Sequence, residues 1–111
     1  LGIRQNIDRL VSKYPLYIFS NTSVSHAEFW RNEYSELLKH FQKIFTSFEL
    51  GMRKPEKESF LEVCSQMEVL PEKILFFDDT EENIVAANDL GMNAVKVDSI
   101  QDISETIDKL C

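Results

Sequence analysis

The chain alternates regularly between two kinds of apolar pattern, and this alternation constrains the fold more than any other feature of the sequence. Four short apolar runs are typical of strands buried on both faces: Leu16–Phe19, Ile44–Phe48, Ile74–Phe77 and Ala94–Val97. The segments around them repeat their apolar residues at the 3.6-residue period of a helix. Strands that alternate with helices and are apolar on both faces form a parallel sheet covered on two sides. We therefore predict an α/β fold, a Rossmann-like three-layer sandwich with a mostly parallel sheet.

Five helices are predicted around these strands. They cover Ile3 to Tyr14, Ser25 to His40, Pro55 to Met67, Ile84 to Leu90 and Ile100 to Leu110. Pro15 ends the first helix, and Gly91 suits the left-handed position that closes the fourth. With 111 residues, 43% of them apolar, and no linker or internal repeat, the chain is long enough for one domain with its own core and too short for two.

The charge balance and the cysteines limit the partners and the compartment. Acidic residues outnumber basic ones by 19 to 12, for a net charge of −7, whereas a general binder of nucleic acid or anionic membrane would carry the opposite sign. No apolar run approaches the roughly twenty residues that span a bilayer. Cys64 and Cys111 form no CxxC pair, which excludes a thiolate metal cluster and favours a reducing compartment, the cytoplasm. Leu1 stands in a helix-like stretch without an initiator Met, so we expect a piece of a longer protein.

Polar residues with a common chemistry follow three of the predicted strands. Ser20 and Asn21 come after the first strand, Lys54 lies in the loop after the second, and Asp78 and Asp79 follow the third. Ligands of such sheets bind beyond the carboxyl ends of the strands, so these side chains should meet on one rim. A hydroxyl and a lysine suit a phosphate group, and paired carboxylates suit Mg²⁺. The sequence therefore predicts a site for a small phosphorylated substrate and a magnesium ion.

Three strings carry these residues in a familiar order: FSNTS, LGMRKPE and FFDDTEENI. They resemble motifs two, three and four of the haloacid dehalogenase-like (HAD) hydrolase superfamily, and look most similar to its α-glucose-1-phosphate phosphatase type. The resemblance implies that Ser20 binds the transferring phosphoryl group and that Asn21 lies at the substrate. It implies that Lys54 holds phosphate and nucleophile together, which makes Ser20 and Lys54 catalytic residues. Asp78 corresponds to the Mg²⁺ ligand, and Asp79 to its support, directly or through other groups.

The first motif of that superfamily, an Asp-x-Asp on the first strand, has no counterpart in this chain, and neither has the cap that follows it. The resemblance therefore implies that residues 1–111 are the C-terminal part of a HAD core. The parent protein is expected to hydrolyse a small metabolite, a sugar phosphate, through an aspartyl-phosphate, and the chain alone is expected to be inactive. The resemblance also implies that the missing strand lies between Leu16–Phe19 and Ile74–Phe77. We expect this gap to be closed by direct pairing of these two strands, by a second copy of the chain or by an upstream segment.

Several other interpretations stay open at this point. A receiver-like phosphoacceptor module also uses an acidic pair, a hydroxyl and a lysine, but its acidic pair belongs at the first strand. A non-catalytic remnant that binds phosphate or a partner, and a haloacid dehalogenase fragment, are further alternatives. Asp78 to Thr80 also suit the cap of the following helix. His26, at the start of a helix, has a structural role or faces the pocket.

Overall fold

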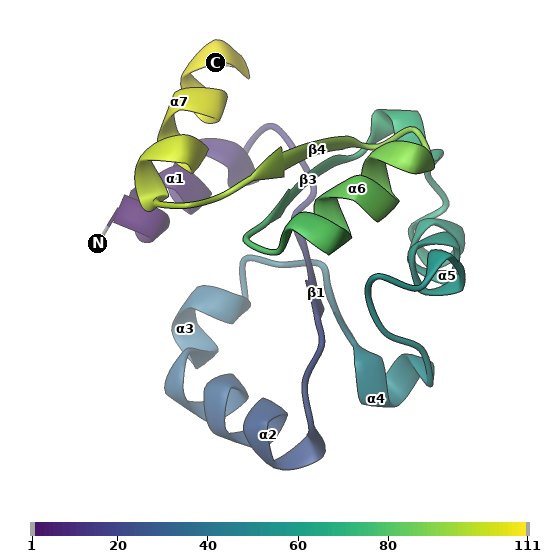
Figure 1. The fold of residues 1–111 in the computed structure, drawn as a ribbon. Coiled ribbons are helices and arrows are strands. Elements are labelled where there is room, and N and C mark those ends of the chain that lie inside the picture. Colours follow the sequence, from purple (N-terminus) through teal and green to yellow (C-terminus); the bar gives the residue numbers. More distant parts are fainter. Residues whose placement is uncertain (1, 111) are drawn as a thin grey trace.

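The structure, a computed structural model, describes residues 2–110 and has the predicted α/β fold (Figure 1). Leu1 and Cys111 lie outside the described residues. The elements are α1 (Gly2–Val11), β1 (Tyr17–Ser20), α2 (Val24–Glu33), α3 (Ser35–Leu38), β2 (Lys43–Thr46), α4 (Ser47–Leu50), α5 (Lys57–Met67), the 3₁₀ turn η1 (Pro71–Lys73), β3 (Leu75–Asp78), α6 (Glu81–Asp89), β4 (Asn93–Lys96) and α7 (Ile100–Leu110). None of the described helices is long and apolar enough to cross a bilayer.

The four strands form two separate parallel pairs. β1 pairs with β2, which sets Ser20 opposite Thr46, and β3 pairs with β4, which sets Asp78 opposite Lys96. Within residues 2–110, no ladder of hydrogen bonds joins β1 to β3. All residues of β1 and of β3 are partly exposed, although central strands of an α/β sheet are normally covered on both faces. Each of these two strands therefore has one edge without a strand partner, and its apolar side chains are only partly covered.

Phe60 of α5 connects the two strand pairs. Its ring is fully buried and lies 5.5 Å, centre to centre, from Phe19 of β1 and 5.5 Å from Phe76 of β3, edge to face in both contacts. Cys64 and Ala87 are buried beside it and pack in the same core cluster. The core of the domain therefore lies on the α5 and α6 side of the strands (Figure 1).

The first and last helices lie side by side at one end of the molecule (Figure 1). Ile7 of α1 and Ile107 of α7 are buried. The Nδ2 atom of Asn6 donates to Ser104 Oγ at 3.1 Å. α1 and α7 thus tie the two ends of the described chain together.

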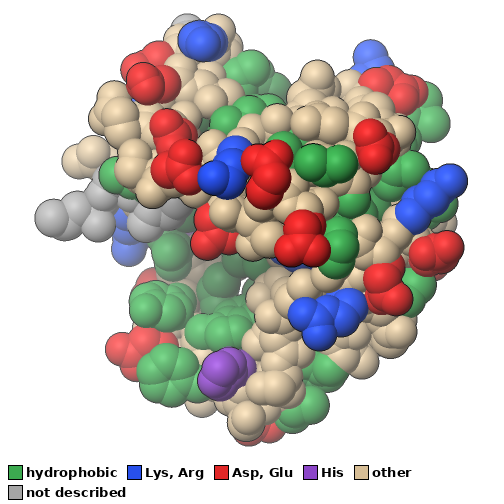
Figure 2. Space-filling model, in the orientation of Figure 1, with side chains coloured by type: hydrophobic (Ala, Val, Ile, Leu, Met, Phe, Trp, Pro, Cys, Tyr) green, Lys and Arg blue, Asp and Glu red, His purple; other side chains and the backbone are tan. Residues whose placement is uncertain are grey.

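The helix predicted from Ser25 to His40 is two helices, α2 and α3, separated at Tyr34. The dihedral angles of Tyr34, φ −112° and ψ 26°, are not helical. Asn, Tyr and Ser have weak helix propensity, and Asn32, Tyr34 and Ser35 cluster at this break. Only Ala27 of α2 is buried, whereas Val24 and Tyr34 are each 54% exposed. The apolar repeat in this region therefore does not report burial, and apolar side chains gather on the surface near α2 (Figure 2).

The second predicted strand is shorter than expected, because it ends at Thr46 and the helix α4 begins at Ser47. The sequence Thr46-Ser-Phe-Glu49 has the residue pattern of a capping box, although the Thr46 side chain caps no backbone N–H of α4 and its hydroxyl instead donates to Glu49 Oε1. Gly51 closes α4 with φ 70°, a left-handed angle that favours glycine. The apolar pattern hid this short helix because Phe48 continues the strand-like run.

Candidate functional site

All five predicted site residues line one cavity of about 400 Å³ at the carboxyl ends of β1 and β3. Its walls consist of Phe19, Ser20, Asn21, Lys54, Phe77, Asp78, Asp79, Thr80 and Asn83. The side chains come from segments far apart in the sequence, and the parallel arrangement of the strands brings their ends together. The predicted convergence is therefore correct, while the role of each residue stays a prediction.

Lys54 joins the two strand pairs at this cavity. Its Nζ atom donates to the carbonyl oxygen of Phe19 at 2.9 Å and to Asp78 Oδ2 at 2.7 Å. The side chains of Lys54 and Asp78 are only 8% and 7% exposed. Nζ also lies 5.0 Å from the ring centre of Phe19 and 5.6 Å from that of Phe76. A buried ammonium is thus held by one carbonyl, one carboxylate and two aromatic faces.

The carboxylate of Asp78 is the most heavily bonded group of the site. Besides Lys54, Oδ2 accepts from Asn83 Nδ2 at 3.3 Å, and Oδ1 accepts from the backbone N–H of Thr80 at 2.9 Å. Burial by itself raises the pKa of Asp78, but the Lys54 ammonium and the Thr80 and Asn83 donors together hold that pKa below its usual value. Asp78 is therefore a stable carboxylate at neutral pH.

Asp79 is exposed, and the Thr80 hydroxyl donates to its Oδ1 at 3.3 Å. Among the described residues, no group of three or more His, Cys, Asp or Glu side chains could hold a metal ion. Mg²⁺ prefers hard oxygen ligands, usually keeps several waters and takes one or two protein carboxylates. Asp78 and Asp79 both line the cavity and match that requirement in residue type and number.

Asn21 and the residue after it connect β1 to the segment that follows β2. The Asn21 amide donates from Nδ2 to the Lys54 carbonyl oxygen at 3.0 Å and accepts at Oδ1 from the Lys54 N–H at 3.0 Å. The Thr22 N–H donates to Ser47 Oγ at 2.9 Å, and Ser47 Oγ donates to the Thr22 carbonyl at 3.2 Å. Ser47 was not predicted to lie near the rim, because the strand-like run placed it inside a strand.

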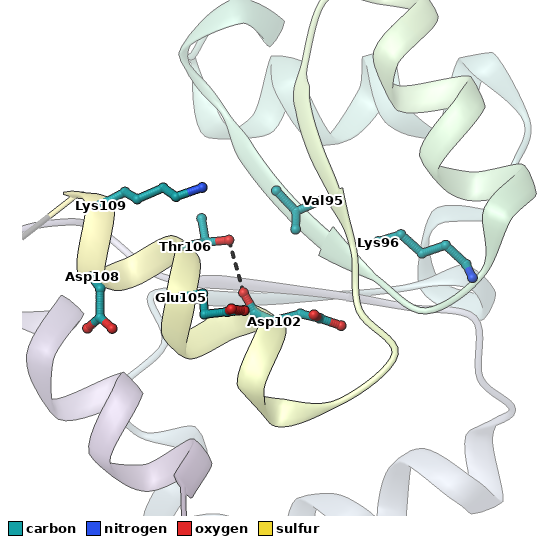
Figure 3. Close-up of a pocket in the computed structure, with 7 residues that line it drawn as sticks. All are labelled: Val95, Lys96, Asp102, Glu105, Thr106, Asp108 and Lys109. Atoms are coloured by element: carbon teal, nitrogen blue, oxygen red, sulfur yellow. Dashed lines mark hydrogen bonds between the residues drawn. The ribbon is translucent and has the colours of Figure 1, made fainter.

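Two other features lie away from this cavity. A hollow of about 460 Å³ between β4 and α7 is lined by Val95, Lys96, Asp102, Glu105, Thr106, Asp108 and Lys109 (Figure 3). It contains none of the predicted site residues, and the one side-chain hydrogen bond between its lining residues runs from the Thr106 hydroxyl to the Asp102 carbonyl. His26 is exposed and does not line the 400 Å³ cavity; its N–H donates to the Ser23 hydroxyl at 3.3 Å and so helps to begin α2.

Residues 2–91 match the sequence model of the haloacid dehalogenase-like hydrolases. The chain belongs to this hydrolase family. Enolase-phosphatase E1 of Persephonella marina is 32% identical to it over 90 residues, which are 79% of this chain and 39% of that protein. D-ribitol-5-phosphate phosphatase of Bacteroides thetaiotaomicron is 30% identical over 96 residues, 82% of this chain and 43% of that protein.

Solved structures of the family share the fold. A HAD family enzyme from Bacteroides thetaiotaomicron, an aspartate-to-alanine mutant in complex with magnesium and inorganic phosphate, superposes with a TM-score of 0.75 at 29% sequence identity. The match covers 85% of this chain and 50% of that enzyme. The chain thus spans half or less of the length of these relatives.

Proposed function

We propose that this chain is the C-terminal part of the core of a magnesium-dependent HAD phosphatase that hydrolyses a small phosphorylated metabolite. The observation that carries the proposal is the buried Lys54 ammonium, 2.7 Å from Asp78 on a rim that also holds Ser20. A cation, a hydroxyl and a carboxylate pair meet there, and phosphoryl transfer requires positioning and neutralisation of negative charge at one place.

Each residue has a defined task in this proposal. The Ser20 hydroxyl donates to an oxygen of the transferring phosphoryl group, next to Asn21 on the same rim. The Lys54 ammonium offsets the like charges of the phosphoryl group and an attacking carboxylate. Asp78 and Asp79 hold the metal, and a bound Mg²⁺ supplies further neutralisation of the charge on the phosphoryl oxygens.

The attacking carboxylate is proposed to come from outside residues 1–111, on a strand that lies between β1 and β3. The absence of a ladder between these two strands supports this, as does the partial exposure of every residue in them. An added strand would pair with both edges, and an aspartate at its carboxyl end would face Lys54 and form the aspartyl-phosphate. A second copy of the chain is the other occupant that these edges would accept, which would make the isolated chain self-associate.

A sugar phosphate is the proposed substrate, in line with the resemblance to the α-glucose-1-phosphate phosphatase type. The identity with D-ribitol-5-phosphate phosphatase supports this class of substrate, and the Mg²⁺ and phosphate bound to the similar enzyme support the metal. The two cysteines without a CxxC pair favour the cytoplasm as the compartment.

Phosphate release from a panel of sugar phosphates tests the proposal. The full-length protein should release phosphate with Mg²⁺ and lose this activity with EDTA, while residues 1–111 alone should stay at background. In the full-length protein, Asp78→Ala should lose most of the rate because a metal ligand is gone. Hydrolysis that is indifferent to EDTA, hydrolysis by the 111-residue chain, or halide release from a 2-haloacid in place of phosphate release would contradict it.

A further inference from the structure

The loop that carries Lys54 has no regular structure to hold it. Met52 and Arg53 have neither helical nor strand conformation, and Lys54 follows them in a turn. A buried backbone N–H and C=O need hydrogen-bond partners, and outside helices and strands a side chain or water must provide them. For Lys54, both bonds come from the one amide of Asn21, at 3.0 Å each. This side chain therefore does for Lys54 what a neighbouring strand does for a residue in a sheet.

The Asn21 amide also fixes the distance over which the Lys54 side chain must reach. Asn21 follows directly on β1, whose Phe19 carbonyl accepts from the Lys54 ammonium. Lys54 is thus attached to the end of β1 at two points: its backbone bonds to Asn21, and its Nζ atom bonds to the Phe19 carbonyl. With both ends fixed, the ammonium comes to lie 2.7 Å from Asp78 on the other strand pair.

We propose that the Asn21 side chain is a positioning residue, which holds the Lys54 ammonium in the buried place between β1 and β3. Its importance for catalysis rests on the proposed function, since Lys54 acts there on the phosphoryl group. An amide is suited to this task because it donates at Nδ2 and accepts at Oδ1, two atoms held in one rigid plane, whereas a carboxylate only accepts and a hydroxyl uses one oxygen for both bonds. The bonds join residues 33 positions apart, so this contact also fixes the loop after β2 onto β1.

The chemical accessibility of Lys54 tests this without any enzyme assay. The full-length protein is treated with a limiting amount of an acetylating N-hydroxysuccinimide ester, and the labelling rate of each lysine is followed by peptide mass spectrometry. Lys54, with a side chain 8% exposed, should react slowly, and exposed Lys39 serves as the internal reference. Asn21→Ala should raise the Lys54 rate at least about tenfold, which corresponds to about 1.4 kcal/mol.

Asn93→Ala is the matched control, because Asn93 Nδ2 also donates to two backbone carbonyls, those of Glu72 and Ile74, at the opposite end of the strands. It should leave the Lys54 rate unchanged. Asn21→Asp keeps the size of the side chain and an acceptor for the Lys54 N–H. The labelling rate of Lys54 in this variant should therefore lie between the rates in the wild type and in Asn21→Ala. Should Asn21→Ala not fold, the rise in Asn21→Asp over the wild type is the test.

A Lys54 rate in the Asn21 variants equal to that of the wild type, or a rise just as large in Asn93→Ala, overturns the proposal. The readout is independent of the proposed function. A protein in which Asn21→Ala exposes Lys54 while phosphate release is unchanged would retain the positioning role and refute the catalytic one.

Discussion

Replacement of Lys54 by Met is the perturbation that tests the site most severely. Met has a similar length and no charge, so the change leaves the Asp78 carboxylate buried with only the Thr80 and Asn83 donors. It also leaves the Phe19 carbonyl without the ammonium. Loss of one partner of a buried ion pair typically costs about 3–5 kcal/mol.

The cost of protonating Asp78 gives a similar value for the loss of stability in Lys54→Met. Asp78 can escape an unpaired buried charge by taking up a proton. At pH 7, about three units above the ordinary pKa of an aspartate, this costs about 4 kcal/mol at 1.36 kcal/mol per unit. We therefore expect Lys54→Met to lower the free energy of unfolding by about 3–4 kcal/mol, a large part of the roughly 5–15 kcal/mol of a typical domain. The loss should shrink by up to about 1.4 kcal/mol for each unit that the pH falls below 7.

Urea unfolding followed through the fluorescence of Trp30, in buffer with EDTA, measures this directly. With a typical slope of about 1.5 kcal/mol per M, a loss of 3 kcal/mol moves the midpoint by about 2 M. Lys39→Met is the control, because the Lys39–Glu36 pair has a similar N–O distance, 2.6 Å, but is 62% and 75% exposed and should contribute nothing measurable. Lys54→Met combined with Asp78→Asn should recover much of the loss. A change in Lys54→Met as small as that in Lys39→Met would refute the argument from burial.

Three further predictions concern the core, the pH dependence and a turn. Phe60→Ala should cost about 3–5 kcal/mol in urea unfolding, because Phe60 packs on both strand pairs; a loss below about 1 kcal/mol would contradict this. The folded-state pKa of Asp78 lies below its unfolded value. The Asp78 carboxylate therefore stabilises the folded state above about pH 4, and this stabilisation is lost as the pH falls through the folded pKa. The difference in stability between the wild type and Asp78→Asn should therefore narrow on acidification, and a constant difference from pH 7 to pH 3 would be inconsistent with it. Gly51→Ala should destabilise the fold by about 1 kcal/mol because of the positive φ of 70°; nothing lies within 4 Å of an added Cβ, so no clash adds to this cost. Gly51→Asn should cost less, because Asn tolerates a left-handed angle better than Ala does. Equal losses in the two variants would contradict the conformational cause.

The strands and the membership of the site follow from local patterns in the sequence. β1 and β3 begin and end within one residue of their predicted bounds, because a run that is apolar on both faces is recognisable without knowledge of its neighbours. The parallel topology then places Ser20, Lys54 and Asp78 on one rim, since Ser20 and Asp78 end β1 and β3 and Lys54 lies in the segment between β2 and α5. These features depend on the order of the strands and polar residues along the chain, and not on individual side-chain contacts.

The features that the patterns missed depend on individual contacts. The break at Tyr34 interrupts an apolar repeat that continues across it, and α4 begins inside a strand-like run. The Thr46-x-x-Glu49 residue pattern and Gly51 were the local signs of α4. The two hydrogen bonds between the Asn21 side chain and the Lys54 backbone have no sequence signal, since an Asn after a strand is equally typical of a turn.

The position of the covalent phosphoryl group tests the central claim most directly. The full-length protein is mixed with a sugar phosphate and Mg²⁺, quenched with acid within the first turnover, and digested for peptide mass spectrometry. The proposed mechanism predicts a phosphorylated aspartate outside residues 1–111, with Asp78 and Asp79 unmodified. A phosphoryl group on Asp78 or Asp79, as in a receiver-like module, would contradict it, as would turnover with no phosphorylated aspartate anywhere in the protein.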